Sequence, residues 1–164
     1  MKKRALSVTI KEKKEVKYYT VAWQEANGEE RRAKSCEWPR PELEAYLDGM
    51  AEFIPWMTTI PKENIAWVEI AGANFEYSKS GVPYLSLGVS IGVRAGLTTN
   101  NGFAFKSPQL PVDLEHANTE NPETIPDKFS GLAKLLHDEI LRYAEGDRAQ
   151  TTLFDEDKKE CVDE

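Results

Sequence analysis

The most regular segment of the chain is Leu85-Ser86-Leu87-Gly88-Val89-Ser90-Ile91-Gly92-Val93-Arg94. Aliphatic residues alternate in it with small or polar ones, and successive side chains of a strand point to opposite faces of a sheet. One face of this segment is therefore aliphatic, and the other is made of Ser, Gly and Arg. The pattern predicts a β-strand that covers the core with one face only.

The face formed by Ser86, Gly88, Ser90 and Gly92 is flat, so another backbone or a ligand can approach it closely. The simplest interpretation is that a helix packs across the sheet on this face. A ligand cleft is the alternative, although no neighbouring chemical group in the sequence identifies what would bind there.

Strand patterns lie on both sides of this segment. A strand at about Ile65 to Tyr77 precedes it through the turn Ser78-Lys79-Ser80-Gly81. A shorter strand is expected to follow it near Gly102 to Lys106. The polar stretch from Ser107 to Glu123 is then expected to be a loop.

The first part of the chain shows the same alternation. The period from Leu6 to Lys11 indicates a strand that turns at Glu12 to Glu15. Further strands are expected at about Val16 to Gln24 and Glu30 to Cys36. Asn27-Gly28 is the strongest two-residue hairpin signal, because both residues tolerate the positive φ of a type I′ turn.

Two segments follow a helical period instead. Apolar residues recur at three- and four-residue spacing from Leu43 to Ile54 and predict a helix ended by the proline that follows. Thr124, with Asp127 three residues later, resembles a capping box for a second helix. The apolar stripe of that helix runs from Phe129 to Tyr143, and Gly146 stops it.

The order of the elements is three strands and a helix, twice over (βββα-βββα). This order predicts an α+β fold, in which an antiparallel sheet of about five to six strands carries two helices on one face. With 164 residues, the chain is long enough for a single compact domain, assigned to residues 1–146. Residues 147–164 lack apolar periodicity and are expected to form a flexible, disordered acidic tail.

Composition indicates a soluble, cytoplasmic protein. The sequence has no apolar run of about 18 residues that would span a membrane, and no secretory h-region follows its first residues. Cys36 and Cys161 lie far apart in the sequence, so both are interpreted as free thiols of a reducing compartment.

Charge is distributed unevenly, although the net charge of −7 argues against a surface covered with phosphate-binding side chains. Residues 1–34 carry ten Lys or Arg against five acids, whereas residues 145–164 carry eight acids against three bases. The basic N-terminal hairpin has the composition of a groove for single-stranded nucleic acid. Its candidate binding residues are Lys11, Lys13, Lys14, Lys17, Tyr18, Arg31, Arg32 and Lys34. In the alternative interpretation, the lysines are a solvated edge that discourages aggregation, while Tyr19 and Trp23 belong to the core.

The acidic segment contains Gln150-Thr151-Thr152-Leu153-Phe154. Leu153 and Phe154 are large apolar residues in a polar segment, where no core of the same domain is expected to bury them. Such a pair can instead bind in a pocket on a partner. The pentapeptide resembles the motif by which bacterial polymerases and mismatch-repair proteins bind the bacterial β sliding clamp, in the looser Gln-x-x-Leu-Phe form. The resemblance covers five residues of 164. It implies that Gln150 hydrogen-bonds at the edge of a groove on the clamp, while Leu153 and Phe154 fill an apolar pocket.

The sequence contains no recognisable enzyme motif. A phosphate loop, a dinucleotide fingerprint, a zinc cysteine pattern and a serine nucleophile elbow are all lacking. Asp113-Leu114-Glu115-His116 and His137-Asp138-Glu139 contain the residue types of a metal or acid-base site, but without ligand spacing. His137 is expected to be a structural histidine. We therefore expect a non-enzymatic protein without catalytic residues, metal ligands or a cofactor.

Three hypotheses for the function remain open. The first is an accessory protein of phage or bacterial DNA replication, recombination or repair that docks on the β sliding clamp through residues 150–154. The second is a single-stranded DNA-binding or annealing protein that uses the basic N-terminal hairpin. The third is an inhibitor or interaction module that blocks a host protein through its folded surface.

Overall fold

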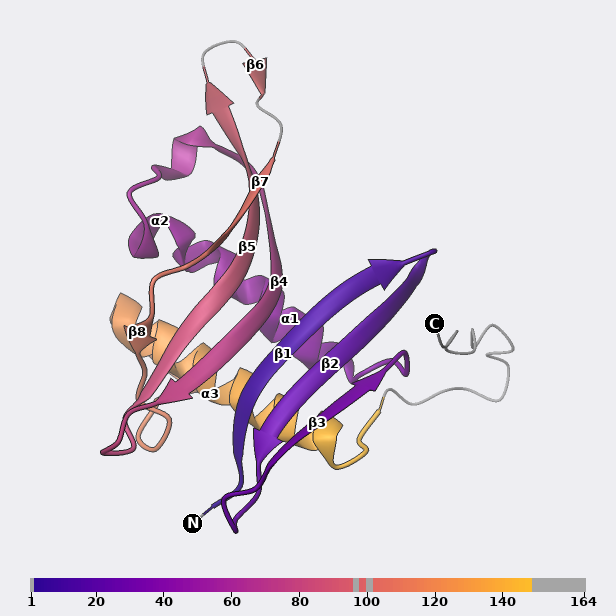
Figure 1. The fold of residues 1–164 in the computed structure, drawn as a ribbon. Helices are drawn as coiled ribbons and strands as arrows, with labels where there is room; N and C mark the ends of the chain where they lie inside the picture. Colours follow the sequence, from indigo (N-terminus) through magenta and orange to yellow (C-terminus); the bar gives the residue numbers. More distant parts are fainter. Residues whose placement is uncertain (1, 96–97, 100–101, 149–164) are drawn as a thin grey trace.

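The computed structural model describes residues 2–95, 98–99 and 102–148 of the chain. It confirms the predicted α+β fold, an antiparallel sheet with helices packed against one face (Figure 1). The strands are β1 (Arg4–Lys13), β2 (Val16–Gln24), β3 (Glu30–Ser35), β4 (Ile65–Tyr77), β5 (Pro83–Ala95), β6 (Thr98–Thr99), β7 (Phe103–Lys106) and β8 (Leu110–Pro111). The helices are α1 (Pro41–Gly49), α2 (Ile54–Met57) and α3 (Ile125–Ala144), with the 3₁₀ turns η1 (Met50–Phe53) and η2 (Lys62–Asn64).

The strands are ordered β3-β2-β1-β4-β5, and the far edge of β5 pairs with β8, β7 and β6 in turn. β6 and β8 are only two residues long, which is too short for an alternation of residue types to predict them from the sequence. β8 lies inside the stretch from Ser107 to Glu123 that the sequence predicts to be a loop. That prediction is wrong for Leu110–Pro111, because these residues pair with the edge of β5.

β1 and β4 meet along a short seam. In the described part of the chain, three residue pairs join them, from Ser7 opposite Asn74 to Thr9 opposite Gly72. Beyond these pairs the two strands separate, as Figure 1 shows. Glycine is needed at position 72, because an added Cβ would lie 2.6 Å from the carbonyl oxygen of Val8. The seam therefore depends on a backbone approach that excludes any side chain at that position.

The core lies between the sheet and the helices α1 and α3. The aliphatic residues of β5 from Leu85 to Ile91 are buried there, as their alternation predicts. Tyr19, Val21 and Trp23 of β2 are buried in the same core, which confirms that they share a face. Burying one such side chain contributes about 1.5–3 kcal/mol. This apolar layer therefore holds the sheet to its helices.

The first predicted helix is present but interrupted. α1 ends at Gly49, the 3₁₀ turn η1 follows, and α2 begins at Ile54 with Pro55 as its second residue. The prediction that Pro55 ends the helix is wrong, because a proline in the first turn of a new helix sacrifices no hydrogen bond. The predicted cap of α3 is confirmed, since Thr124 Oγ1 accepts a hydrogen bond of 3.2 Å from the amide of Asp127.

The two hairpin turns differ from the prediction. Lys14 and Glu15 both have positive φ, 50° and 66°, so the tight two-residue turn joins β1 to β2. In the second hairpin, Gly28 has positive φ but Asn27 does not, and the Gly28 amide donates to the Glu25 carbonyl over 2.9 Å. A type I′ turn is therefore wrong here. The loop is longer than two residues and needs only one residue in the left-handed region.

The C-terminal end of α3 is tied to the segment after β3. Arg148 forms an ion pair with Glu37 at 3.0 Å and donates a hydrogen bond to the Tyr143 carbonyl. Its guanidinium carbon also lies 3.5 Å from the centroid of the Tyr143 ring. Asp147 and Arg148 are thus part of the described structure, and the rest of the expected tail, residues 149–164, lies outside the described residues.

Two observations bear on the expectation of a cytoplasmic protein with free thiols. Cys36 is buried and disulfide-bonded, so its interpretation as a free thiol is wrong. Cys161 lies outside the described residues. No helix within residues 2–95 and 102–148 combines the length and apolarity needed to cross a membrane.

Candidate functional site

One face of the sheet is not covered by the helices. α1 and α3 pack on one side of the sheet (Figure 1), and the buried Leu87 and Val89 belong to the core on that side. The intervening residues, such as Ser86 and Gly88, belong to the opposite side, which we call the open face. The prediction that the Ser-Gly face of β5 seats a helix is therefore wrong. The helices pack on the aliphatic face because it offers the apolar area whose burial stabilises the fold.

Backbone pairing aligns residues of six strands in one row across the open face. Lys34 pairs with Thr20, Thr20 with Thr9, Thr9 with Gly72, Gly72 with Gly88, and Gly88 with Lys106. Directly opposed residues on neighbouring strands point to the same face. This central row therefore has a lysine at each end, with two threonines and two glycines between them.

A second row lies beside the central row. It aligns Arg32, Ala22, Ser7, Asn74 and Ser86, from β3 to β5. Its side chains are small and uncharged, except for the long, charged arginine at the edge of the sheet. The middle of the open face thus combines close access to the backbone with hydroxyl and amide groups.

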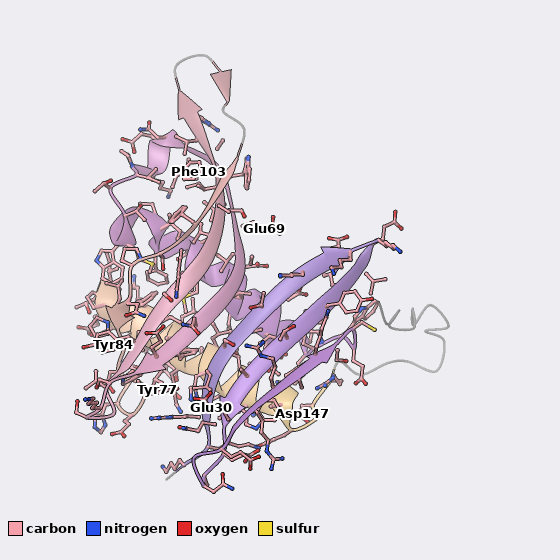
Figure 2. The ribbon with its side chains drawn as sticks, in the orientation of Figure 1. Glu30, Glu69, Tyr77, Tyr84, Phe103 and Asp147 are labelled. Atoms are coloured by element: carbon pink, nitrogen blue, oxygen red, sulfur yellow. The ribbon has the colours of Figure 1, made fainter. Side chains whose placement is uncertain are left out.

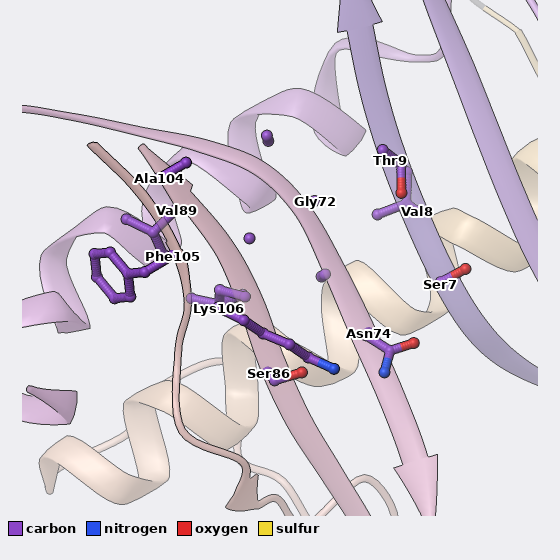
Figure 3. Close-up of a pocket in the computed structure, with 14 residues that line it drawn as sticks. Ser7, Val8, Thr9, Gly72, Asn74, Ser86, Val89, Ala104, Phe105 and Lys106 are labelled. Atoms are coloured by element: carbon purple, nitrogen blue, oxygen red, sulfur yellow. The ribbon is translucent and has the colours of Figure 1, made fainter. Parts of the chain in front are cut away.

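The two rows border a pocket of about 530 Å³ between β1, β4, β5 and β7 (Figure 3). Ser86 lines this pocket but is only 1% exposed, and its Oγ has no hydrogen-bond partner in the described structure. In Figure 3, the Lys106 side chain extends across the pocket toward Ser86. A buried polar group without a partner costs roughly 1–3 kcal/mol. A ligand oxygen that reached this hydroxyl after a shift of Lys106 would remove that cost.

Charged side chains of both signs lie on both sides of the sheet, but cations outnumber acids on the open face. Acids of the helix layer include Glu42, Glu44, Asp48 and Glu52. Strand alternation places on the open face cations that include Lys11, Lys13, Arg32, Lys34, Arg94 and Lys106, together with the acids Glu30, Glu69 and Glu76. Figure 2 labels Glu30 and Glu69. The net charge of −7 therefore does not describe the open face.

The eight predicted nucleic-acid-binding residues do not all lie on the same side of the sheet. Strand alternation places five of them on the open face: Lys11, Lys13, Tyr18, Arg32 and Lys34. Lys34 Nζ lies 5.0 Å from the centroid of the Tyr18 ring. Lys14 lies in the turn after β1. Lys17 and Arg31 occupy positions of the helix side, where they pair with Glu44 at 3.2 Å and Glu29 at 3.4 Å.

Sequence patterns identify the face of Ser86 but miss Asn74 and Lys106. Lys106 becomes part of the site only because β7 pairs with β5 in the register that sets it opposite Gly88. A one-residue slip would turn its side chain to the other face. The predicted strand near Gly102 to Lys106 is the only local signal, and it does not specify a register.

His137 has a structural role. Its Nε2 accepts a hydrogen bond of 3.1 Å from the Ala5 amide, and its Nδ1 lies 3.1 Å from Asp138 Oδ1. Burial favours protonation of Asp138, but hydrogen bonds from His137 and Lys134 outweigh burial and hold the pKa of this carboxyl below its usual value. Within the described ranges, no three His, Cys, Asp or Glu side chains are arranged to hold a metal ion.

The other predicted site, formed by Gln150, Leu153 and Phe154, lies outside the described residues. The sequence matches no protein-family model, and comparisons with curated proteins and with solved structures found no match. Function is therefore inferred from the open face and from the sequence of that peptide.

Proposed function

We propose that the chain is a non-enzymatic accessory protein of bacterial or phage DNA replication, recombination or repair, and that it binds single-stranded DNA across the open face. The observation that carries the proposal is the central row, with Lys34 and Lys106 at its ends and only threonine and glycine between them. Lysines neutralise phosphates, and the small residues between them let a strand lie close to the sheet. The proposed place of action is the cytoplasm.

The dimensions of the central row suit a single strand. It crosses five strand-to-strand spacings, or about 24 Å in total, which accommodates several nucleotides. Tyr18 lies beside Lys34 and provides an aromatic surface near one end of the row. Reading a duplex requires an element that enters a groove. The threonines and glycines of the row do not provide such a projection, so the unpaired strand is favoured.

The proposal is tested with the double variant Lys34→Gln plus Lys106→Gln. We expect its affinity for a short oligothymidylate to fall about tenfold at moderate salt. Each phosphate contact to a single strand contributes about 0.7 to the slope of log affinity against log salt, so the slope should decrease by about 1.4. Fluorescence anisotropy over a series of salt concentrations measures both quantities.

The matched control for this test is Lys17→Gln plus Arg31→Gln. It removes the same number of positive charges, but from residues that pair with Glu44 and Glu29 on the helix side. We expect this control to change affinity less than twofold and to leave the salt slope unchanged. Equal losses in the two double variants would show that net charge, and not the open face, governs binding. Absence of binding by the wild-type chain would refute the proposal outright.

We further propose that residues 150–154 tether the protein to the bacterial β sliding clamp. The support is the Gln150-x-x-Leu153-Phe154 pattern in a segment whose remaining residues are mostly polar. A tether raises the local concentration of the folded domain at replicating DNA, so the open face needs only moderate affinity of its own.

Leu153→Ala plus Phe154→Ala tests the tether. The double variant should bind a purified bacterial β clamp at least tenfold more weakly, since both apolar anchors are lost. Thr151→Ala plus Thr152→Ala, at the unspecified motif positions, should bind almost as the wild type does. Surface plasmon resonance on immobilised clamp gives the affinities. Unchanged binding by the Leu153/Phe154 variant, or no binding by the wild type, would refute the proposed tether. It would not affect the proposal of DNA binding, which the lysine variants test separately.

A further inference from the structure

Trp67 of β4 lies on two glycines of the open face. A Cβ added to Gly92 of β5 would overlap the five-membered part of the indole, at Nε1, Cε2 and Cδ1. A Cβ added to Gly102, just before β7, would overlap the six-membered ring at Cζ2 and Cη2. The indole therefore spans from β5 to the start of β7, and the absence of side chains at both glycines makes this position possible.

The outer side of this indole is accessible. Trp67 is 43% exposed, although its inner side rests on the glycines. Gly92 alternates with the buried Ile91, so Trp67 is on the same face of the sheet as the central row. Gly92 lies four positions after Gly88 in β5, which corresponds to about 13 Å along the strand. Contact with the two glycines accounts for the inner side of the ring, and the outer side packs against no other element in the part of the chain that the structure describes.

The surroundings of Trp67 favour a nucleobase over a plain apolar partner. Arg94, two residues beyond Gly92, lies on the same face by strand alternation and is exposed. Glu69 occupies the neighbouring outward position of β4, between Trp67 and the central row, and is also exposed. An indole flanked by charged side chains suits a flat, polar-edged ring that is attached to a phosphate. A large apolar protein surface would have to strip water from both charges.

We infer that Trp67 is a stacking platform for one unpaired base, and that the DNA-binding site therefore extends from the central pocket along β5 to this residue. The inference rests on the proposed binding of single-stranded DNA and adds a contact of a different kind. The lysines bind phosphates and make affinity depend on salt. The indole binds a base through its π face, which contributes affinity without releasing counterions.

Trp67→Leu is the test variant, because leucine keeps the two glycines covered by an apolar side chain but cannot stack. We expect its affinity for oligothymidylate to fall roughly five- to a hundredfold, the range for loss of one base–aromatic contact, with an unchanged salt slope. Trp67→Phe should recover most of the affinity. The control is Trp38→Leu, which alters a tryptophan that is 60% exposed and lines a different pocket, with Lys17 and Glu44. This control should bind as the wild type does.

A second measurement separates stacking from a change in folding. Wild type should bind an oligonucleotide with abasic positions less tightly than the intact strand, and the Trp67→Leu variant should show a smaller difference between the two strands. Equal affinity of wild type and Trp67→Leu for the intact strand would overturn the inference and leave the proposed function standing. An abasic penalty that is the same in both proteins would also overturn it. If the wild type binds no oligonucleotide, the proposed function fails first and the inference with it.

Discussion

Gly72→Ala should lower the free energy of unfolding by about 3 kcal/mol, because it forces β1 and β4 apart. The new Cβ would lie 2.6 Å from the Val8 carbonyl oxygen and 3.4 Å from the Thr9 Cα, and both of these are backbone atoms. A rotamer change cannot relieve this overlap. The strands themselves must move, and only three residue pairs of the described structure hold them together. Urea unfolding followed by circular dichroism measures the loss.

Gly88→Ala is the matched control for Gly72→Ala. Gly88 pairs with Gly72 in the central row, but the atoms nearest to an added Cβ are 3.8 Å and 3.9 Å away, an ordinary contact distance. We expect this substitution to change stability by less than about 1 kcal/mol. If the two alanine variants were equally stable, the close approach at Gly72 would not be what constrains the seam.

Arg40→Ala should destabilise the protein by about 3 kcal/mol at neutral pH, since it leaves the buried carboxylate of Glu139 without its partner. Arg40 Nη1 donates to Glu139 Oε1 over 3.0 Å, and Glu139 is only 6% exposed. The pair also connects α3 to the N-terminus of α1, where Arg40 is the residue before the helix. Chemical denaturation of the wild type and the variant at several pH values measures the effect.

The pH dependence identifies the cause of this loss. Burial raises the pKa of Glu139 above its ordinary value, although Arg40 opposes the rise. Removing Arg40 therefore raises the pKa further, and the penalty is largest where the carboxylate is charged. The penalty should shrink as the pH falls from neutral toward 4.5, the ordinary value for Glu, because the folded protein can then protonate the group. In an Arg40→Ala plus Glu139→Gln variant, the loss should be smaller and nearly independent of pH. A single-variant loss that stays constant with pH would exclude the unpaired charge as the cause.

Periodicity in the sequence predicted the large elements because each is long enough to repeat its pattern. The alternation around Leu87 and the helical stripe ending at Tyr143 both describe one buried face, and burial of that face is what the structure shows. The residue types in the turns were a less reliable basis for predicting turn conformation. Lys14 and Glu15 adopt left-handed conformations that their side chains do not favour. The pairing of the two strands therefore determines the conformation of this turn, and the turn residues themselves do not predict it.

The candidate site was only partly predictable, because it depends on how distant strands align. Lys34 was identified from the basic composition of the hairpin, but Lys106 joins it in one row only through four intermediate strands. The sequence likewise marks Gly92 as a small residue without indicating that Trp67 lies on it. Registers between strands follow from the packing of the whole core, which no single segment encodes.

The short seam between β1 and β4 also has a consequence for the order of events in folding. The residues that it joins are 63 to 67 positions apart in the chain, from Thr9 with Gly72 to Ser7 with Asn74, whereas β1, β2 and β3 are linked by short turns. Closing a long loop costs entropy before the contacts at its ends return any stability. We therefore expect the N-terminal hairpins to assemble first from local contacts, and the open face to become continuous when the seam closes. The complete open face is thus expected to form late in folding, so that oligonucleotide binding, if the proposed function holds, measures the finished tertiary structure and not only the content of strand and helix.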